Sequence, residues 1–113
     1  MSIDDPTKVD GAAIDKDGRY VVLMISDHLD WVEEGEHLLM LQDKLNAYHE
    51  LIASGALTRK MPKARGLPAI IRIYGKFPLS RQATEFLETA RTIFEKDGIA
   101  IEFELSNDET RRQ

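Results

Sequence analysis

The stretch that decides the fold is Lys16-Asp17-Gly18, followed by Tyr20-Val21-Val22-Leu23-Met24-Ile25. Asp-Gly is a strong signal for a tight chain reversal, because glycine adopts positive φ without steric cost. The stretch predicts a β-hairpin whose arms are 9–15 and 19–26. The second arm is apolar at every position from 20 to 25, whereas a strand with one buried face alternates. We expect both of its faces to be covered, either by the chain's own helices and tail or by a dimer contact.

Two helices are expected from apolar residues at helical spacing. The first follows the polar connector 27–34 and ends near Ser54, with Asp30 and Glu33 in a capping-box relation and Gly55 after its end. Its apolar stripe consists of Leu38, Leu41, Leu45, Tyr48 and Ile52. The second begins after Ser80 as N-cap and ends near Asp97. Its stripe consists of Ala83, Phe86, Leu87, Ala90, Ile93 and Phe94.

Two further strands, 69–77 and 99–105, complete the order β-β-α-β-α-β. Arg72 lies on the polar face of the first of these strands and Glu102 on that of the second. Opposite charges of this kind stabilise neighbouring strands, and a short βαβ crossover is parallel and right-handed. The fold class is therefore α/β (α+β): a two-layer, four-stranded mixed sheet with two helices on one face. The strand order is 1-2-3-4 if both crossovers are right-handed and both helices share a face, and the long connection 56–68 leaves the direction of the first crossover open.

The chain of 113 residues fits one domain. We assign residues 9–105 to the domain and residues 1–8 and 106–113 to flexible tails, because the two ends are polar. The connection 56–68 exceeds the usual connector of about 4–6 residues. It carries four cations, Arg59, Lys60, Lys63 and Arg65.

Composition excludes several function classes. Cysteine is absent, which excludes disulfides, thiolate metal sites and a cysteine nucleophile. The net charge of −5 argues against general nucleic-acid binding. No apolar run approaches the roughly 18 residues of a membrane span, and residues 1–10 lack the apolar segment of a signal peptide. No serine-hydrolase elbow occurs, which argues against nucleophilic hydrolysis. No phosphate-binding glycine loop occurs either, and we expect no cofactor.

One short segment concentrates chemically active side chains. Residues 26–31 hold Asp27, His28, Asp30 and Trp31 between a strand and a helix, where binding sites often form. A histidine beside carboxylates can act as a general base, and Arg72 or the basic loop could hold an anion. The alternative is structural: the two aspartates cap the helix while Trp31 seals its end.

We expect no metal site. Glu34 and His37 form a Glu-x-x-His pair, the spacing found in di-iron bundles. Those sites need a second such pair, and His49 has Asn46 three residues before it. His37 and His49 lie at the two edges of the apolar stripe of the first helix, which suits boundary residues better than ligands.

The string Ser26-Asp27-His28-Leu29-Asp30-Trp31, preceded by Ile25 and followed by residues 37–48, resembles a family of small bacterial proteins classed as a domain of unknown function. Residues 9–15 and 70–74 are also similar, so the resemblance covers roughly residues 9–105. It implies a bacterial, cytosolic protein with the two-layer fold. It supplies no activity, substrate or catalytic residue.

Three function hypotheses follow. The first is a non-enzymatic protein-interaction or dimerisation module, a homodimer or a binder of a protein partner, motivated by the apolar strand, the wide apolar surface of the first helix and the opposite charges of the loops 27–36 and 59–65. The second is a small enzyme or anion-ligand-binding domain that uses Asp27, His28, Asp30 and Trp31. The third, nucleic-acid binding through the basic loop, is disfavoured by the net charge.

Overall fold

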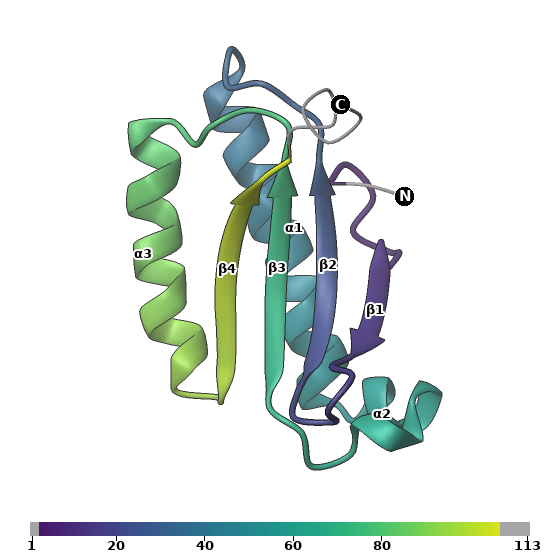
Figure 1. The fold of residues 1–113 in the computed structure, drawn as a ribbon. Coiled ribbons are helices and arrows are strands. Elements are labelled where there is room, and N and C mark those ends of the chain that lie inside the picture. The colour runs from purple at the N-terminus through teal and green to yellow at the C-terminus, as the bar shows by residue number, and fades with distance from the viewer. Residues whose placement is uncertain (1–2, 107–113) are drawn as a thin grey trace.

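The turn at Gly18 forms as its sequence predicts. The computed structural model describes residues 3–106. In it, Gly18 has a φ of 70° and donates its N–H to the carbonyl of Asp15 at 2.7 Å. The turn joins β1 (Gly11–Ile14) to β2 (Val21–Asp27), and the two strands pair antiparallel (Figure 1). The predicted hairpin is confirmed.

The sheet has four strands in the order β1-β2-β3-β4, the order predicted for right-handed crossovers with both helices on one face. β2 pairs parallel with β3 (Ala69–Gly75), and β3 pairs parallel with β4 (Ile99–Leu105), so the sheet is mixed. Arg72 lies opposite Glu102, and its guanidinium is 2.9 Å from the carboxylate. The predicted cross-strand charge pair is therefore present.

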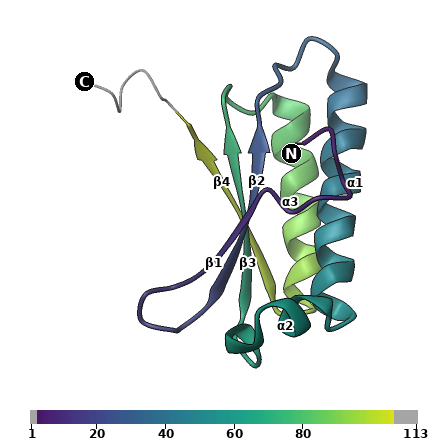
Figure 2. The ribbon, with the colours of Figure 1, turned by 90° about the vertical axis from the view of Figure 1, so that its right-hand side faces the viewer.

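Two long helices, α1 (Glu34–Ala53) and α3 (Arg81–Glu95), cover one face of the sheet, and the other face is open (Figure 2). This is the predicted two-layer α+β fold. Ser80 caps α3 by accepting the N–H of Ala83 at 3.1 Å. The capping box predicted for α1 is wrong: Glu33 is its N-cap without a side-chain hydrogen bond, and Asp30 accepts the N–H of Val32 at 3.1 Å instead.

The face of α1 that packs on the sheet differs from the predicted apolar stripe because it includes two polar residues, His37 and Lys44. Leu38 and Ile52, at the edge of that face, are only half-buried. The buried residues of α1 are His37, Leu41, Lys44, Leu45 and Tyr48.

The connection 56–68 is not an irregular loop. It contains a short helix, α2 (Ala56–Lys60), and a 3-10 turn, η1 (Pro62–Ala64). Leu57 and Ala64 are 5% and 2% exposed and belong to the core. These two buried side chains hold the long connection against the core.

None of the helices within residues 3–106 has the length and apolar character needed to cross a membrane.

A single chain already covers the apolar strand β2. Leu23 and Ile25 are fully buried, and Val22 is 6% exposed. The N-terminal segment contributes to this packing: Ile3 is fully buried and donates its N–H to the carbonyl of Ser26 at 2.9 Å. The polar composition of residues 1–8 predicts a flexible tail, yet Ile3 of this segment packs in the core. The other predicted tail, apart from Ser106, lies outside the described residues.

Candidate functional site

A buried acid–base pair joins the end of β2 to the first turn of α1. The carboxylate oxygens of Asp27 lie 2.6 and 2.7 Å from Nε2 of His37. Asp27 also accepts the N–H of Leu29 at 3.2 Å, which turns the chain away from the sheet. Asp27 is 4% and His37 2% exposed, so water does not screen their interaction.

The remaining contacts of His37 fix its chemistry. Nδ1 lies 2.8 Å from the carbonyl oxygen of Asp30; since a carbonyl only accepts, Nδ1 carries a proton and donates it. Trp31 stacks on the imidazole with ring centroids 3.5 Å apart and an interplanar angle of 14°. Burial raises the pKa of Asp27, and the hydrogen bond with His37 opposes that rise. Both ring nitrogens are occupied, so the imidazole serves to join β2 and α1 in this arrangement.

A small polar cavity of about 200 Å³ lies at the carboxyl ends of β2 and β3. Two of the predicted site residues, Asp27 and His28, contribute to it, and His28 is exposed. Ligands of parallel sheets commonly bind at this end of the strands. The complete lining is Ser26, Asp27, His28, Tyr74, Lys76 and Ser106.

The structure does not bring the other predicted site residues into this cavity. Asp30 lines a separate cavity of about 180 Å³ beside Glu33 and Glu36. Trp31 lies against His37, and Arg72 is engaged with Glu102 on the open face of the sheet. Asp27, the Asp30 carbonyl and Trp31 instead meet on His37. His28 and Arg72 lie apart from that contact.

Lys44 is the centre of a second buried polar cluster, which the sequence analysis missed. Its side chain is fully buried, and Nζ donates to the carbonyls of Asp5 and Lys8 at 2.6 and 2.7 Å and to the Asp10 carboxylate at 3.0 Å. Tyr48, one turn later, donates its hydroxyl to the carbonyl of Met24 at 2.7 Å and accepts the N–H of Asp10 at 2.9 Å. The cluster fixes residues 5–10 against α1 and β2.

A signal for both missed clusters was present in the helix. His37 and Lys44 share the helical face of Leu41, Leu45 and Tyr48, at spacings of three and four residues. A charged residue within an apolar face needs a buried partner. The sequence alone did not show which partner, because Asp27 and Asp10 lie in other elements.

The outer edge of β4 has no strand beside it among residues 3–106. The N–H of Ser106 bonds the carbonyl of Gly75 in β3 at 2.7 Å, whereas the carbonyl of Ile101 accepts Nε of Arg91 in α3 at 3.0 Å. Backbone groups of a strand alternate in direction, so those of Ile99, Ile101 and Phe103 face away from β3.

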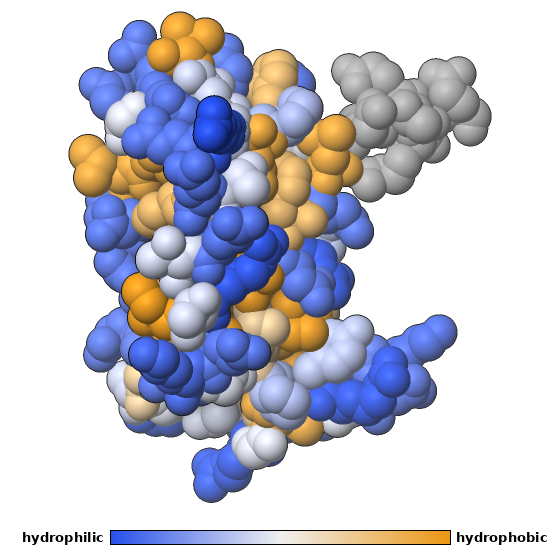
Figure 3. Space-filling model, turned by 90° about the vertical axis from the view of Figure 1, so that its left-hand side faces the viewer, coloured by the Kyte–Doolittle hydropathy of each residue, from blue (hydrophilic) through white to orange (hydrophobic). Residues whose placement is uncertain are grey.

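A cleft of about 460 Å³ lies between this edge and α3. The side of the molecule formed by α3 and β4 shows apolar surface next to the polar surface of the helix (Figure 3). The cleft is lined by Arg91, Thr92, Glu95 and residues 98–101. It combines the outward-facing backbone of Ile99 and Ile101, apolar side chains and a few charges.

The four cations predicted as a basic loop, Arg59, Lys60, Lys63 and Arg65, are exposed on and around α2 and η1. This region lies at the opposite end of the molecule from the start of α1 (Figure 1). The basic loop and the acidic residues 27–36 therefore do not meet within one chain.

The comparisons with known proteins agree with the resemblance found in the sequence. The model of a family described as a family of unknown function (DUF6572) matches residues 1–107. No curated protein and no solved structure matches the chain.

Proposed function

Since this chain belongs to a family of unknown function, DUF6572, we propose a function from its own contacts: it is a non-enzymatic protein-interaction module that binds an extended segment of another protein along β4. The supporting observation is the cleft of about 460 Å³ between α3 and the outer edge of β4. A cleft of this size falls in the range of ligand sites, about 300–1,000 Å³.

An added strand would use backbone groups that β4 presents outward. The N–H and C=O groups of Ile99 and Phe103 and the N–H of Ile101 face away from β3, as the bonding of Ser106 and Arg91 indicates. In strand addition, main-chain hydrogen bonds supply affinity and alternate side chains supply specificity. The helix beside the edge gives the added strand a second surface for packing.

A dimer through β2 and α1 is a weaker alternative. Val22, Leu23 and Ile25 are buried within one chain, so β2 has little apolar surface left for a partner. The one large apolar side chain that α1 exposes is Leu39, at 60%. Isolated exposed leucines are common on monomers.

The proposal is tested with peptides selected from a random ten-residue display library and added to the ¹⁵N-labelled chain. We expect the selected peptides to shift the amide signals of Ile99, Ile101 and Phe103. Binding should be lost in a semisynthetic chain that carries N-methyl-Phe103, because that amide faces outward. N-methylation leaves the β3–β4 ladder intact, so the circular dichroism spectrum serves as the control for folding. Binders whose shifts lie elsewhere, or that tolerate the methyl group, would disprove strand addition.

A second candidate function rests on the polar cavity of about 200 Å³ at the carboxyl ends of β2 and β3. Lys76 and His28 could hold a small anion there, with Tyr74 as a hydroxyl donor. The same labelled sample distinguishes this function when it is titrated with inorganic phosphate. A saturable shift of His28 and Lys76 that disappears in Lys76→Ala supports a ligand site, and unchanged spectra exclude this anion.

We also propose that the protein is bacterial and cytoplasmic. The support is the resemblance of residues 25–31 and 37–48 to small bacterial proteins, together with a composition without cysteine.

A further inference from the structure

We infer that the segment received by β4 carries alternating basic and apolar residues, with its basic side chains on the open face of the sheet and its apolar side chains toward α3. This inference rests on the proposed strand addition and specifies its partner. It comes from the charges and the burial on the two sides of the β4 edge.

The open-face side of the edge is acidic. Ala100, Glu102 and Glu104 alternate on this face, and all three are exposed. Glu102 is already paired with Arg72 at 2.9 Å, whereas Glu104 lies opposite Tyr74 in the register. An added strand would place every second side chain beside these carboxylates. Lysine or arginine at those positions gains favourable cross-strand pairing.

The helix side of the edge favours apolar side chains. Ile99 and Ile101 are 2% and 4% exposed and point toward the helix layer, and Phe103 is packed against the same core. Arg91 approaches from α3 and donates to the carbonyl of Ile101 at 3.0 Å. Its guanidinium would repel a cation on this side. A basic residue is therefore directed to the open face and an apolar residue to the cleft.

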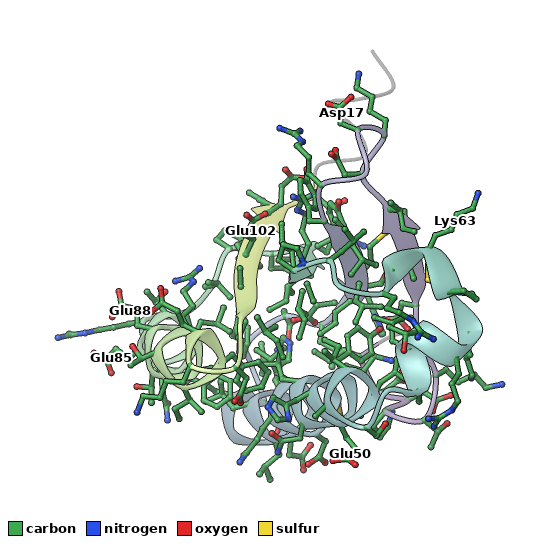
Figure 4. The ribbon with its side chains drawn as sticks, turned by 90° about the horizontal axis from the view of Figure 1, so that it is seen from below. Asp17, Glu50, Lys63, Glu85, Glu88 and Glu102 are labelled. Carbon is green, nitrogen blue, oxygen red and sulfur yellow. The ribbon has the colours of Figure 1, made fainter. Side chains whose placement is uncertain are left out.

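Carboxylates of the helix and the strand border this region on two sides. Glu95 lines the cleft, and the view from below shows Glu102 beside β4, whereas Glu85 and Glu88 lie on the side of α3 that faces away from β4 (Figure 4). The chain as a whole carries a net charge of −5. Long-range attraction and contacts at the edge thus favour a basic segment together.

A second copy of this chain fits the edge poorly. In an antiparallel β4–β4 pair centred on Ile101, Glu102 or Phe103, carboxylates of the two copies meet at opposite or diagonal positions on the open face. Like charges at such positions destabilise a strand pair. A basic partner removes this repulsion, which is why we choose a different protein as the occupant.

The test uses three acetylated nine-residue peptides that differ only in pattern. One alternates Lys or Arg with Val, the second alternates Glu with Val, and the third has the composition of the first without its alternation. We expect the first to bind at least tenfold more tightly than the others by isothermal titration in 50 mM salt. Its affinity should fall as the salt concentration rises.

Charge-reversal variants then locate the contact. The double variant Glu102→Lys/Glu104→Lys should weaken the basic peptide at least tenfold and strengthen the acidic one. Glu85→Lys/Glu88→Lys, which makes the same charge change on exposed positions of α3 outside the cleft lining, should change both affinities by a smaller factor. Amide shifts of the folded variants confirm that the sheet is intact.

Each outcome is decisive for one of the two proposals. If the acidic or non-alternating peptide binds as tightly as the basic one at the β4 edge, the charge pattern is wrong and strand addition stands. If no alternating peptide binds and library selection also yields no binder at this edge, strand addition itself is wrong. In that case Arg91 and the glutamates serve to protect an edge strand from pairing.

Discussion

Lys44 shows how one charged residue can organise a core. Its ammonium group has three donors and contacts three acceptors, the carbonyls of Asp5 and Lys8 and the carboxylate of Asp10. Asp10 uses its other oxygen to accept the N–H of Ser26 at 2.9 Å. No buried side-chain nitrogen or oxygen within residues 3–106 lacks a hydrogen-bond partner. The hydrogen bonds of the cluster depend on one another, so removing one member leaves the buried polar groups of the others without a partner.

We predict that Lys44→Met lowers the free energy of unfolding by about 3–5 kcal/mol, because it leaves the buried Asp10 carboxylate without its cation. Urea unfolding followed by circular dichroism measures the loss. Adding Asp10→Asn should cost less than the sum of the two single changes. The exposed neighbour provides the control: Asp43→Asn should change stability by less than about 0.5 kcal/mol. Additive effects of Lys44→Met and Asp10→Asn would contradict this coupling.

Tyr48 makes the stability of the fold depend on pH in the alkaline range. Burial raises the pKa of the Tyr48 hydroxyl to about 12, against 10.0 for an ordinary tyrosine. Between these pH values the folded chain binds more protons than the unfolded chain, so stability is complete below pH 10 and falls as the pH rises toward 12. The loss amounts to about 2 kcal/mol.

We expect urea midpoints measured at pH 9 and pH 11.5 to show this loss in the native chain. In Tyr48→Phe, which is less stable at pH 9 because two hydrogen bonds are missing, the decline with pH should be smaller. Tyr20→Phe, a change in the hairpin, should keep the native slope. Parallel pH profiles for all three chains would show that Tyr48 does not control the decline.

At the scale of the elements, a close contact between Gly75 of β3 and the ring of Phe103 in β4 holds the two strands together. A Cβ added at Gly75 would lie 2.5 Å from Cε1 and 2.7 Å from Cζ of Phe103. The ring of Phe103 therefore covers the end of β3, and only glycine leaves it room. The same ring partly fills the space between the sheet and the helix layer.

We predict that Gly75→Ala destabilises the chain by about 1–3 kcal/mol, because the added methyl group displaces the Phe103 ring. In the Phe103→Leu background the same change should cost less, since the smaller side chain vacates the space. Thermal unfolding of the four chains gives the coupling. Gly35, which has no atom within 4 Å of an added Cβ, provides the control as Gly35→Ala. An equal cost of Gly75→Ala in both backgrounds would contradict the contact.

Local sequence patterns predicted the elements well where the structure depends only on neighbouring residues. The Asp17-Gly18 turn and the Ser80 cap formed as expected, because each depends on residues next to it. The face of α1 and the start of that helix were less predictable. His37 and Lys44 are buried only because Asp27 and Asp10, distant along the chain, meet them. Tertiary partners of this kind leave no periodic pattern.

At the scale of the whole molecule, the sequence predicted the layers and strand order but not the site. The strand order followed from right-handed crossovers with both helices on one face, and the charges of Arg72 and Glu102 indicated the pairing of β3 with β4. In the candidate loop 26–31, Asp27, the Asp30 carbonyl and Trp31 contact His37 of α1, whereas His28 stays exposed. The cleft beside β4 could not be predicted, because the strand at the edge of the sheet is known only once the whole sheet is assembled.

The anchoring of the two halves of the fold is uneven. Lys44, Tyr48 and His37 connect the N-terminal segment, β2 and α1 through buried polar contacts. The C-terminal half, α3 with β4, is attached by apolar packing, the ladder to β3 and two exposed polar pairs, Arg72–Glu102 and His49–Asp97. Partial opening of the native state should therefore begin with release of the α3–β4 hairpin-like unit, while the rest keeps its structure. The proposed docking surface would then lie in the part of the molecule that we expect to open first, and a bound segment would stabilise that part.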